Sequence, residues 1–161
     1  MNAAEALAGT TVRDVLIGVR SLDFLKHPPS GSLDLALIYQ PGLAVSEQEK
    51  TALVDAAGSG IKTETLTVHL VPVSVSDLAR IEKFHFVLLT SGLQSHFQTI
   101  FERTKGKSIL TMSADLDCVR SGRCVMGVVS QPLVRVLVNH AASEDAVVMF
   151  DESFRMMITE F

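Results

Sequence analysis

The chain has 161 residues, of which 47% are hydrophobic, and its 14 basic and 18 acidic residues give a net charge of −4. This length supports one well-packed core, so we expect a single domain over residues 1–161. The scattered basic residues exclude the positive surface that binds a nucleic-acid backbone, and no nucleic-acid partner is expected. No apolar run is long enough to span a membrane, and the first residues lack the pattern of a secretion signal.

The first half of the chain predicts helices alternating with strands. Apolar residues at helical spacing predict an amphipathic helix over Thr10–Lys26, which the prolines of "HPPSGS" end. The apolar run 33–39, "LDLALIY", is typical of a strand that is covered on both faces. Ser46 and Glu49 then form the pattern of a capping box, which predicts the start of a second helix.

The same alternation continues to residue 113. Strands are predicted over 62–73, 84–90 and 107–113, with a short helix after the first of them and a longer one after the second. Four strands that alternate with helices indicate an α/β fold, a three-layer α/β/α domain with a mainly parallel sheet.

After Ser113 the pattern changes. The β-rich segments 124–130 and 133–139 are too close for a helical crossover, which predicts a C-terminal antiparallel hairpin. Residues 140–161 predict two short helices with a turn at Asp151. Three apolar residues at helical spacing in the second helix are expected to pack into the core: Phe154, Met157 and Phe161. The alternative is an exposed Met-rich face that docks a partner.

The only two cysteines, Cys118 and Cys124, lie on either side of a turn sequence. A zinc site needs three or four ligands, and no second Cys pair or nearby histidine supplies them, so no metal is expected. Redox catalysis uses a closer Cys-x-x-Cys pair at a helix N-terminus. A disulfide that closes the short loop and two reduced thiols remain as alternatives, of which we favour the disulfide.

Catalytic motifs are absent from the sequence: it has no nucleophile elbow, no zinc-protease motif and no phosphate-binding loop. We therefore predict no catalytic residue, no cofactor and no enzyme. The segment "LLTSGLQS" passes from a strand end to a helix start, where free amides can bind an anion, but with one glycine we favour the alternative, a helix cap and a flexible turn.

A ligand-binding crevice is the site that the predicted topology favours. In open α/β sheets, ligands lie beyond the carboxyl ends of the strands. If the first, third and fourth strands are neighbours, one crevice contains the polar residues at their ends: Gln40, Ser91, Gly92, Ser113 and Asp115.

The order of elements resembles the YfiR-like family of small periplasmic proteins. The resemblance rests on the early helix and strand 22–39, the strand "KGKSILTMS", the turn and strand "SGRCVMGVV", and the Asn-Ala-Ala segment in "VLVNHAASEDAVVMF". It implies a non-enzymatic periplasmic regulator that represses a membrane-bound signalling enzyme, a diguanylate cyclase, often as a homodimer with redox-sensitive disulfides. It also favours pairing of the two cysteines.

A second resemblance leads to a different function. Residues 33–78 are similar to the opening of one lobe of ABC-transporter solute-binding proteins, in which a strand, loop and helix supply ligand contacts. This resemblance implies a sensor that binds a small molecule. The sequence therefore leaves two hypotheses: a protein-interaction module in the periplasm, which we take as the first, and a small-ligand binder as the alternative.

Overall fold

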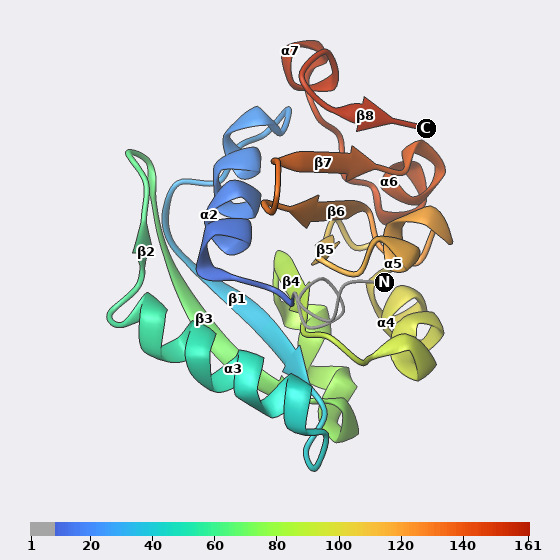
Figure 1. Ribbon diagram of the computed structural model, residues 1–161. Helices are drawn as coiled ribbons and strands as arrows, with labels where there is room; N and C mark the ends of the chain where they lie inside the picture. Colours follow the sequence, from blue (N-terminus) through green and yellow to red (C-terminus); the bar gives the residue numbers. More distant parts are fainter. Residues whose placement is uncertain (1–8) are drawn as a thin grey trace.

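A computed structural model of the chain describes residues 9–161, which form a mixed sheet covered by helices (Figure 1). Within these residues the sheet has eight strands in the spatial order β2-β3-β1-β4-β5-β6-β7-β8. In chain order the strands are β1 Gly31–Tyr39, β2 Ile61–Lys62, β3 Leu66–Ser74, β4 Phe86–Leu89, β5 Leu110–Ser113, β6 Met126–Val129, β7 Arg135–Val138 and β8 Thr159–Glu160.

The centre of the sheet is parallel. The neighbours β3, β1, β4, β5 and β6 run in one direction, whereas β2 is antiparallel to β3 and β7 is antiparallel to β6. The short strand β8 continues the sheet parallel to β7. The predicted fold class, α/β with a mainly parallel sheet and a C-terminal antiparallel hairpin, is confirmed.

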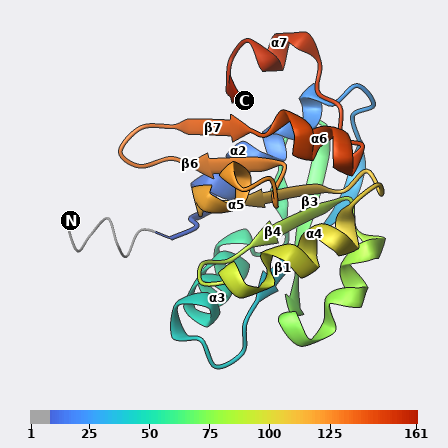
Figure 2. The same ribbon diagram turned by 90° about the vertical axis from the view of Figure 1, so that its right-hand side faces the viewer.

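Helices pack on both faces of this sheet, and α4 lies in front of the strands in Figure 2. No helix of the described part of the chain is long and apolar enough to cross a membrane. The α-helices are α2 Val12–Ser21, α3 Ala44–Ala57, α4 Phe97–Thr104, α5 Leu116–Arg120, α6 His140–Ala146 and α7 Glu152–Arg155, and the 3-10 helices are η1 Leu22–Phe24, η2 Val75–Lys83 and η3 Gln94–His96.

Strand β1 shows how the sequence produces these layers. Leu35 and Leu37 belong to the core that includes residues of α2 and α3, whereas Ala36 and Ile38 belong to the core that includes residues of η2 and α4. All four side chains are fully buried. Successive side chains of a strand point to opposite faces, so a strand covered on both faces needs an unbroken apolar run.

Two predicted elements differ from the structure. The strand predicted over 62–73 is divided into β2 and β3, which pair as an antiparallel hairpin. The last predicted helix is only α7, which ends at Arg155, because the chain then extends into β8. Phe154 is buried as expected, but Met157 and Phe161 are 63% and 50% exposed, so the prediction that they pack into the core was wrong.

The predicted disulfide joins Cys118 in α5 to Cys124, which precedes β6. Their Cα atoms are 5.2 Å apart, and both side chains are buried. The carbonyl of Cys118 also accepts hydrogen bonds from the amides of Arg123 and Cys124, at 2.9 and 3.1 Å. The disulfide therefore closes the turn that leads from α5 into β6.

Candidate ligand-binding sites

The predicted ligand-binding residues lie at the ends of β1, β4 and β5, which we call the carboxyl edge. These strands are adjacent in the sheet, as the prediction required. Gln40 follows β1, Ser91 and Gly92 follow β4, Ser113 ends β5, and Asp115 is the N-cap of α5. All of them except Gly92 have a polar atom in a hydrogen bond within the protein.

A first group of hydrogen bonds joins β1, α3 and β4 through two buried hydroxyls. The amide of Gln40 donates to Ser46 Oγ at 2.8 Å, and Thr90 Oγ1 donates to the carbonyl of Ile38 at 2.9 Å. Since the proton of Thr90 is used in this way, Ser46 is the donor in the 2.6 Å bond between the two hydroxyls. Ser46 therefore does not cap α3, which begins at Ala44, and the predicted capping box was wrong.

The carboxylate of Glu49 binds the backbone amide of Ser91, one of the amides that the sequence suggested could bind an external anion. Its Oε1 accepts hydrogen bonds from the amides of Ser91 and Thr10, both at 3.1 Å. Its Oε2 is buried and lies against Gly9, where an added Cβ would be 2.5 Å from that oxygen. A carboxylate of the protein itself thus lies where the less favoured interpretation of the sequence placed an external anion, after β4.

The second group joins the loops after β4 and β5. The amide of Asp115 donates to Ser113 Oγ, and Asp115 Oδ1 accepts from the amide of Asp117, each at 3.0 Å. Gln94 Nε2 donates to the other carboxylate oxygen of Asp115, also at 3.0 Å. Sequence reasoning missed Gln94 because its position in η3 carries no recognisable motif.

Gly92 has a structural reason to be glycine. Its φ is +87°, in the left-handed region that favours glycine, and an added Cβ would lie 2.5 Å from Leu43 Cδ2. The residue therefore allows the loop after β4 to pass close to the start of α3.

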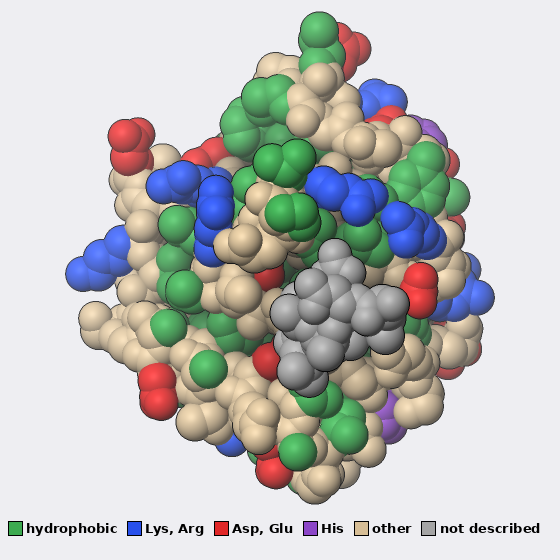
Figure 3. All heavy atoms as spheres, viewed as in Figure 1, with side chains coloured by type: hydrophobic (Ala, Val, Ile, Leu, Met, Phe, Trp, Pro, Cys, Tyr) green, Lys and Arg blue, Asp and Glu red, His purple; other side chains and the backbone are tan. Residues whose placement is uncertain are grey.

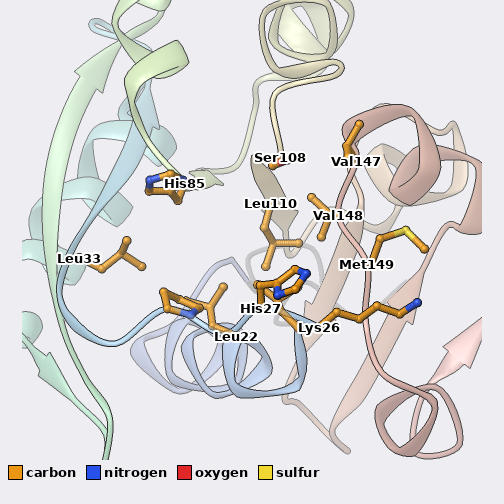
Figure 4. Close-up of a pocket in the computed structure, with 12 residues that line it drawn as sticks. Leu22, Lys26, His27, Leu33, His85, Ser108, Leu110, Val147, Val148 and Met149 are labelled. Atoms are coloured by element: carbon orange, nitrogen blue, oxygen red, sulfur yellow. The ribbon is translucent and has the colours of Figure 1, made fainter.

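A cavity of about 500 Å³ lies at the opposite edge of the sheet, where β1 and β5 begin (Figure 4). We call it the amino-edge cavity, and sequence reasoning did not predict it. Its walls are mainly apolar, and its polar side chains come from separate segments of the chain. It is lined by Leu22, Leu25, Lys26, His27, Pro29, Leu33, His85, Ser108, Leu110, Val147, Val148 and Met149.

Backbone hydrogen bonds hold the walls of this cavity in place. The amide of Lys26 donates to the carbonyl of Met149 at 2.9 Å, next to an antiparallel bridge between Leu25 and Phe150. On another side, the amide of Ser108 donates to the carbonyl of Ala146 at 2.8 Å. A cavity framed in this way needs little reorganisation to receive a ligand.

Two residues of the lining have a strained backbone. Ser108 and Val147 are the non-glycine residues with positive φ within residues 9–161, at 58° and 59°. This conformation is a true outlier for a β-branched residue such as Val147. Residues with a strained backbone are found at functional sites more often than elsewhere, so the two outliers support a functional role for this cavity.

No cluster of three or more His, Cys, Asp or Glu side chains in residues 9–161 is placed to hold a metal ion. No protein-family model and no curated protein sequence matches this chain.

A solved structure similar to this chain is an ABC domain in complex with L-Trp from Streptococcus pneumonia. The TM-score is 0.63 at 13% identity, and the match covers 91% of this chain and 60% of that one. Our chain thus spans about 60% of the length of that domain, and at this identity the likeness establishes the fold alone. It supports the resemblance to a solute-binding lobe at that level, whereas the resemblance to the YfiR-like family finds no support here.

Proposed function

We propose that the chain is a non-enzymatic module that binds a small organic molecule in the amino-edge cavity. The observation that carries this proposal is the cavity itself, whose mainly apolar walls hold a few polar side chains. Ligand sites of proteins typically have this composition and volumes of about 300 to 1,000 Å³. The ABC domain with a similar fold, which was solved with L-Trp, adds support for a ligand-binding role.

The carboxyl edge is the rival location for the ligand. Its residues Gln40, Ser91 and Asp115 have backbone or side-chain atoms in hydrogen bonds within the protein, so a ligand there would have to displace or add to these bonds. In the amino-edge cavity only backbone groups are used in this way, and within residues 9–161 the polar side chains of its lining form no hydrogen bond that a ligand would have to displace. We therefore favour the amino-edge cavity.

A thermal-shift experiment with small amino acids, carboxylates and L-Trp would test this proposal, because a ligand that binds the folded state raises the melting temperature. Met149 lines the cavity, and because it is 45% exposed the fold should accept a larger side chain at this position. Met149→Trp should therefore occupy part of the cavity and abolish the shift. Met156, which is 87% exposed and outside the lining, provides the control Met156→Trp. A shift that survives Met149→Trp but disappears in Gln94→Ala would place the ligand at the carboxyl edge.

Contact with a membrane-bound signalling protein is the second candidate function. Met156, Met157 and Phe161 follow α7 and expose apolar side chains, and methionine adapts to varied partner surfaces. The α7 end of the molecule, at the top of Figure 3, has hydrophobic side chains on its surface. The disulfide suits an oxidising compartment, and this candidate places the protein in the periplasm.

The second candidate has its own test. Purified protein should lower the activity of a diguanylate cyclase in membrane vesicles, and Met156→Ser with Met157→Ser should remove that effect. Sedimentation of the purified protein and of the Met156→Ser, Met157→Ser variant would reveal whether either forms a homodimer. An unchanged cyclase activity would leave the ligand-binding proposal alone.

A further inference from the structure

The side chains that line the amino-edge cavity have a marked charge asymmetry. Lys26, His27, His85 and Ser108 supply hydrogen-bond donors, and none of the lining residues is Asp or Glu. We infer that the ligand of this cavity is a small monocarboxylate with an apolar body and without an amino group. This inference rests on the proposed function and names the class of ligand.

The donors are arranged around the cavity rather than on one side of it. In Figure 4, His27 lies on the side of Val148, whereas His85 lies across the cavity near Leu33. The Lys26 amine extends toward the side of Met149, at the rim. An imidazole has at least one N–H in either protonation state, so both histidines can donate to a carboxylate.

A neighbouring cavity extends the positive region. It shares Leu33 and His85 with the amino-edge cavity and adds the cations Arg80 and Lys83, against one carboxylate, Asp34. Arg80 forms a 3.5 Å ion pair with Asp77, whereas Lys83 and Lys26 form none within residues 9–161. The charged side chains at this edge therefore favour an anion.

The helix α2 opposes this preference only weakly. Its carboxyl end leads into the cavity wall at Leu22, and the carbonyls at a helix end carry partial negative charge. However, the amide of Leu22 donates to the carbonyls of Val19 and Arg20, which reduces their effect on a ligand. The positive charge of the cationic side chains therefore outweighs the partial negative charge at the carboxyl end of α2.

The apolar walls exclude a second charge of the opposite sign. Leu22, Leu110 and Val148 are buried and line the space beneath the polar rim. An ammonium group placed there would lose its hydration without meeting a carboxylate, which is costly. A free amino acid is therefore a poorer ligand than the matching acid that lacks the amino group.

Four compounds that share an indole ring separate these possibilities: indole-3-acetate, L-Trp, tryptamine and 3-methylindole. Binding to the wild-type protein is measured by calorimetry at low and high salt. We expect indole-3-acetate to bind about tenfold more tightly than 3-methylindole, the size of a charged hydrogen bond, and tryptamine to bind weakest. Salt should weaken the binding of the acid and leave that of 3-methylindole nearly unchanged.

Variants of the donors test the cause of the preference. His27→Leu and His85→Leu should each bring the affinity for the acid closer to that for 3-methylindole, whereas His96→Leu, outside the lining, should not. Equal binding of acid and neutral compound, lost in Met149→Trp, would overturn the ligand class and leave the proposed function standing. If neither this series nor hexanoate, hexylamine and 1-hexanol binds, both proposals fail.

Discussion

The hydroxyl of Ser46 donates to the hydroxyl of Thr90 over 2.6 Å in the interior of the protein. Ser46 lies in α3 and Thr90 follows β4, and neither side chain is more than 1% exposed. Because each hydroxyl also bonds the backbone of β1 or of the residue after it, the pair joins three elements at the carboxyl edge.

Ser46→Ala should destabilise the protein. The change leaves the amide of Gln40 without its acceptor and Thr90 without its donor, and a buried unpaired polar group costs about 1 to 3 kcal/mol. Urea unfolding measures the loss, and Thr51→Ala, at an exposed position of the same helix, is the control. The cost should be smaller in a Thr90→Val background, because the bond is already absent there; strictly additive effects would contradict this coupling.

The main strands could be predicted from the sequence because their signals are local. The unbroken apolar run of β1 reflects burial on both faces, and the close spacing of β6 and β7 permits only a hairpin. The capping-box prediction failed because Ser46 and Glu49 have the right spacing for a cap, yet their partners lie in the segments after β1, after β4 and before α2. Spacing alone cannot distinguish a local partner from a distant one.

The amino-edge cavity could not be predicted, because its lining comes from four distant segments. Residues 22–33, His85, 108–110 and 147–149 meet only when the sheet is assembled. The predicted residues of the carboxyl edge were easier to identify, since strand ends can be placed once the order of strands is known. The sequence did not reveal that the amide of Ser91 already donates a hydrogen bond to Glu49.

Gly92→Ala should be more destabilising than Gly42→Ala, which provides a matched control. Both glycines have positive φ, at 87° and 84°, so alanine pays the backbone cost of about 1 to 2 kcal/mol at either position. Only at Gly92 does the added Cβ meet a neighbour, Leu43, whereas the space around Gly42 is open. Denaturant midpoints of the two variants isolate the packing cost, and equal midpoints would show that Leu43 moves away freely.

Reduction of the disulfide should lower the melting temperature. Cys118 and Cys124 are separated by 6 positions, and closing so short a loop is worth about 2 kcal/mol through the entropy of the unfolded chain. Calorimetry with and without a phosphine reductant measures the change. A Cys118→Ala, Cys124→Ala protein should melt lower than the wild type and not respond to the reductant. Two free thiols in mass spectra of the non-reduced protein would contradict the pairing.

Asp151 should make the free energy of unfolding depend on pH. Hydrogen bonds from the Ser153 hydroxyl and the Phe154 amide hold the pKa of this carboxyl below its ordinary value of 3.8. A lowered pKa in the folded state means that the stabilisation is present above the unfolded pKa and is lost as pH falls through the folded pKa.

Asp151→Asn removes this dependence while keeping an N-cap side chain for α7. The difference in unfolding free energy between wild type and Asp151→Asn should therefore shrink as the pH is lowered from about 6 to about 3. Asp55→Asn, on the exposed side of α3, is the control. A difference that stays constant over this range would show that the Asp151 hydrogen bonds do not favour the ionised carboxylate.

Val147→Gly should stabilise the protein, although it removes a side chain from the cavity wall. Val147 has φ 59° and ψ 46° at the end of α6, a conformation that costs a non-glycine residue about 1 to 3 kcal/mol. Glycine relieves this strain but adds about 0.5 to 1 kcal/mol of unfolded-state entropy, so we expect a net gain of about 1 kcal/mol.

Val134→Gly provides the comparison for this last change. Val134 is 48% exposed, close to the 51% of Val147, but it has no positive φ, so glycine there should only destabilise. Chemical denaturation of both variants measures the contrast, because any loss from removing a half-exposed valine is shared. If Val147→Gly unfolds at the same denaturant concentration as Val134→Gly, or below it, the cavity wall stores no strain at this position, and the backbone outlier gives no reason to expect function there.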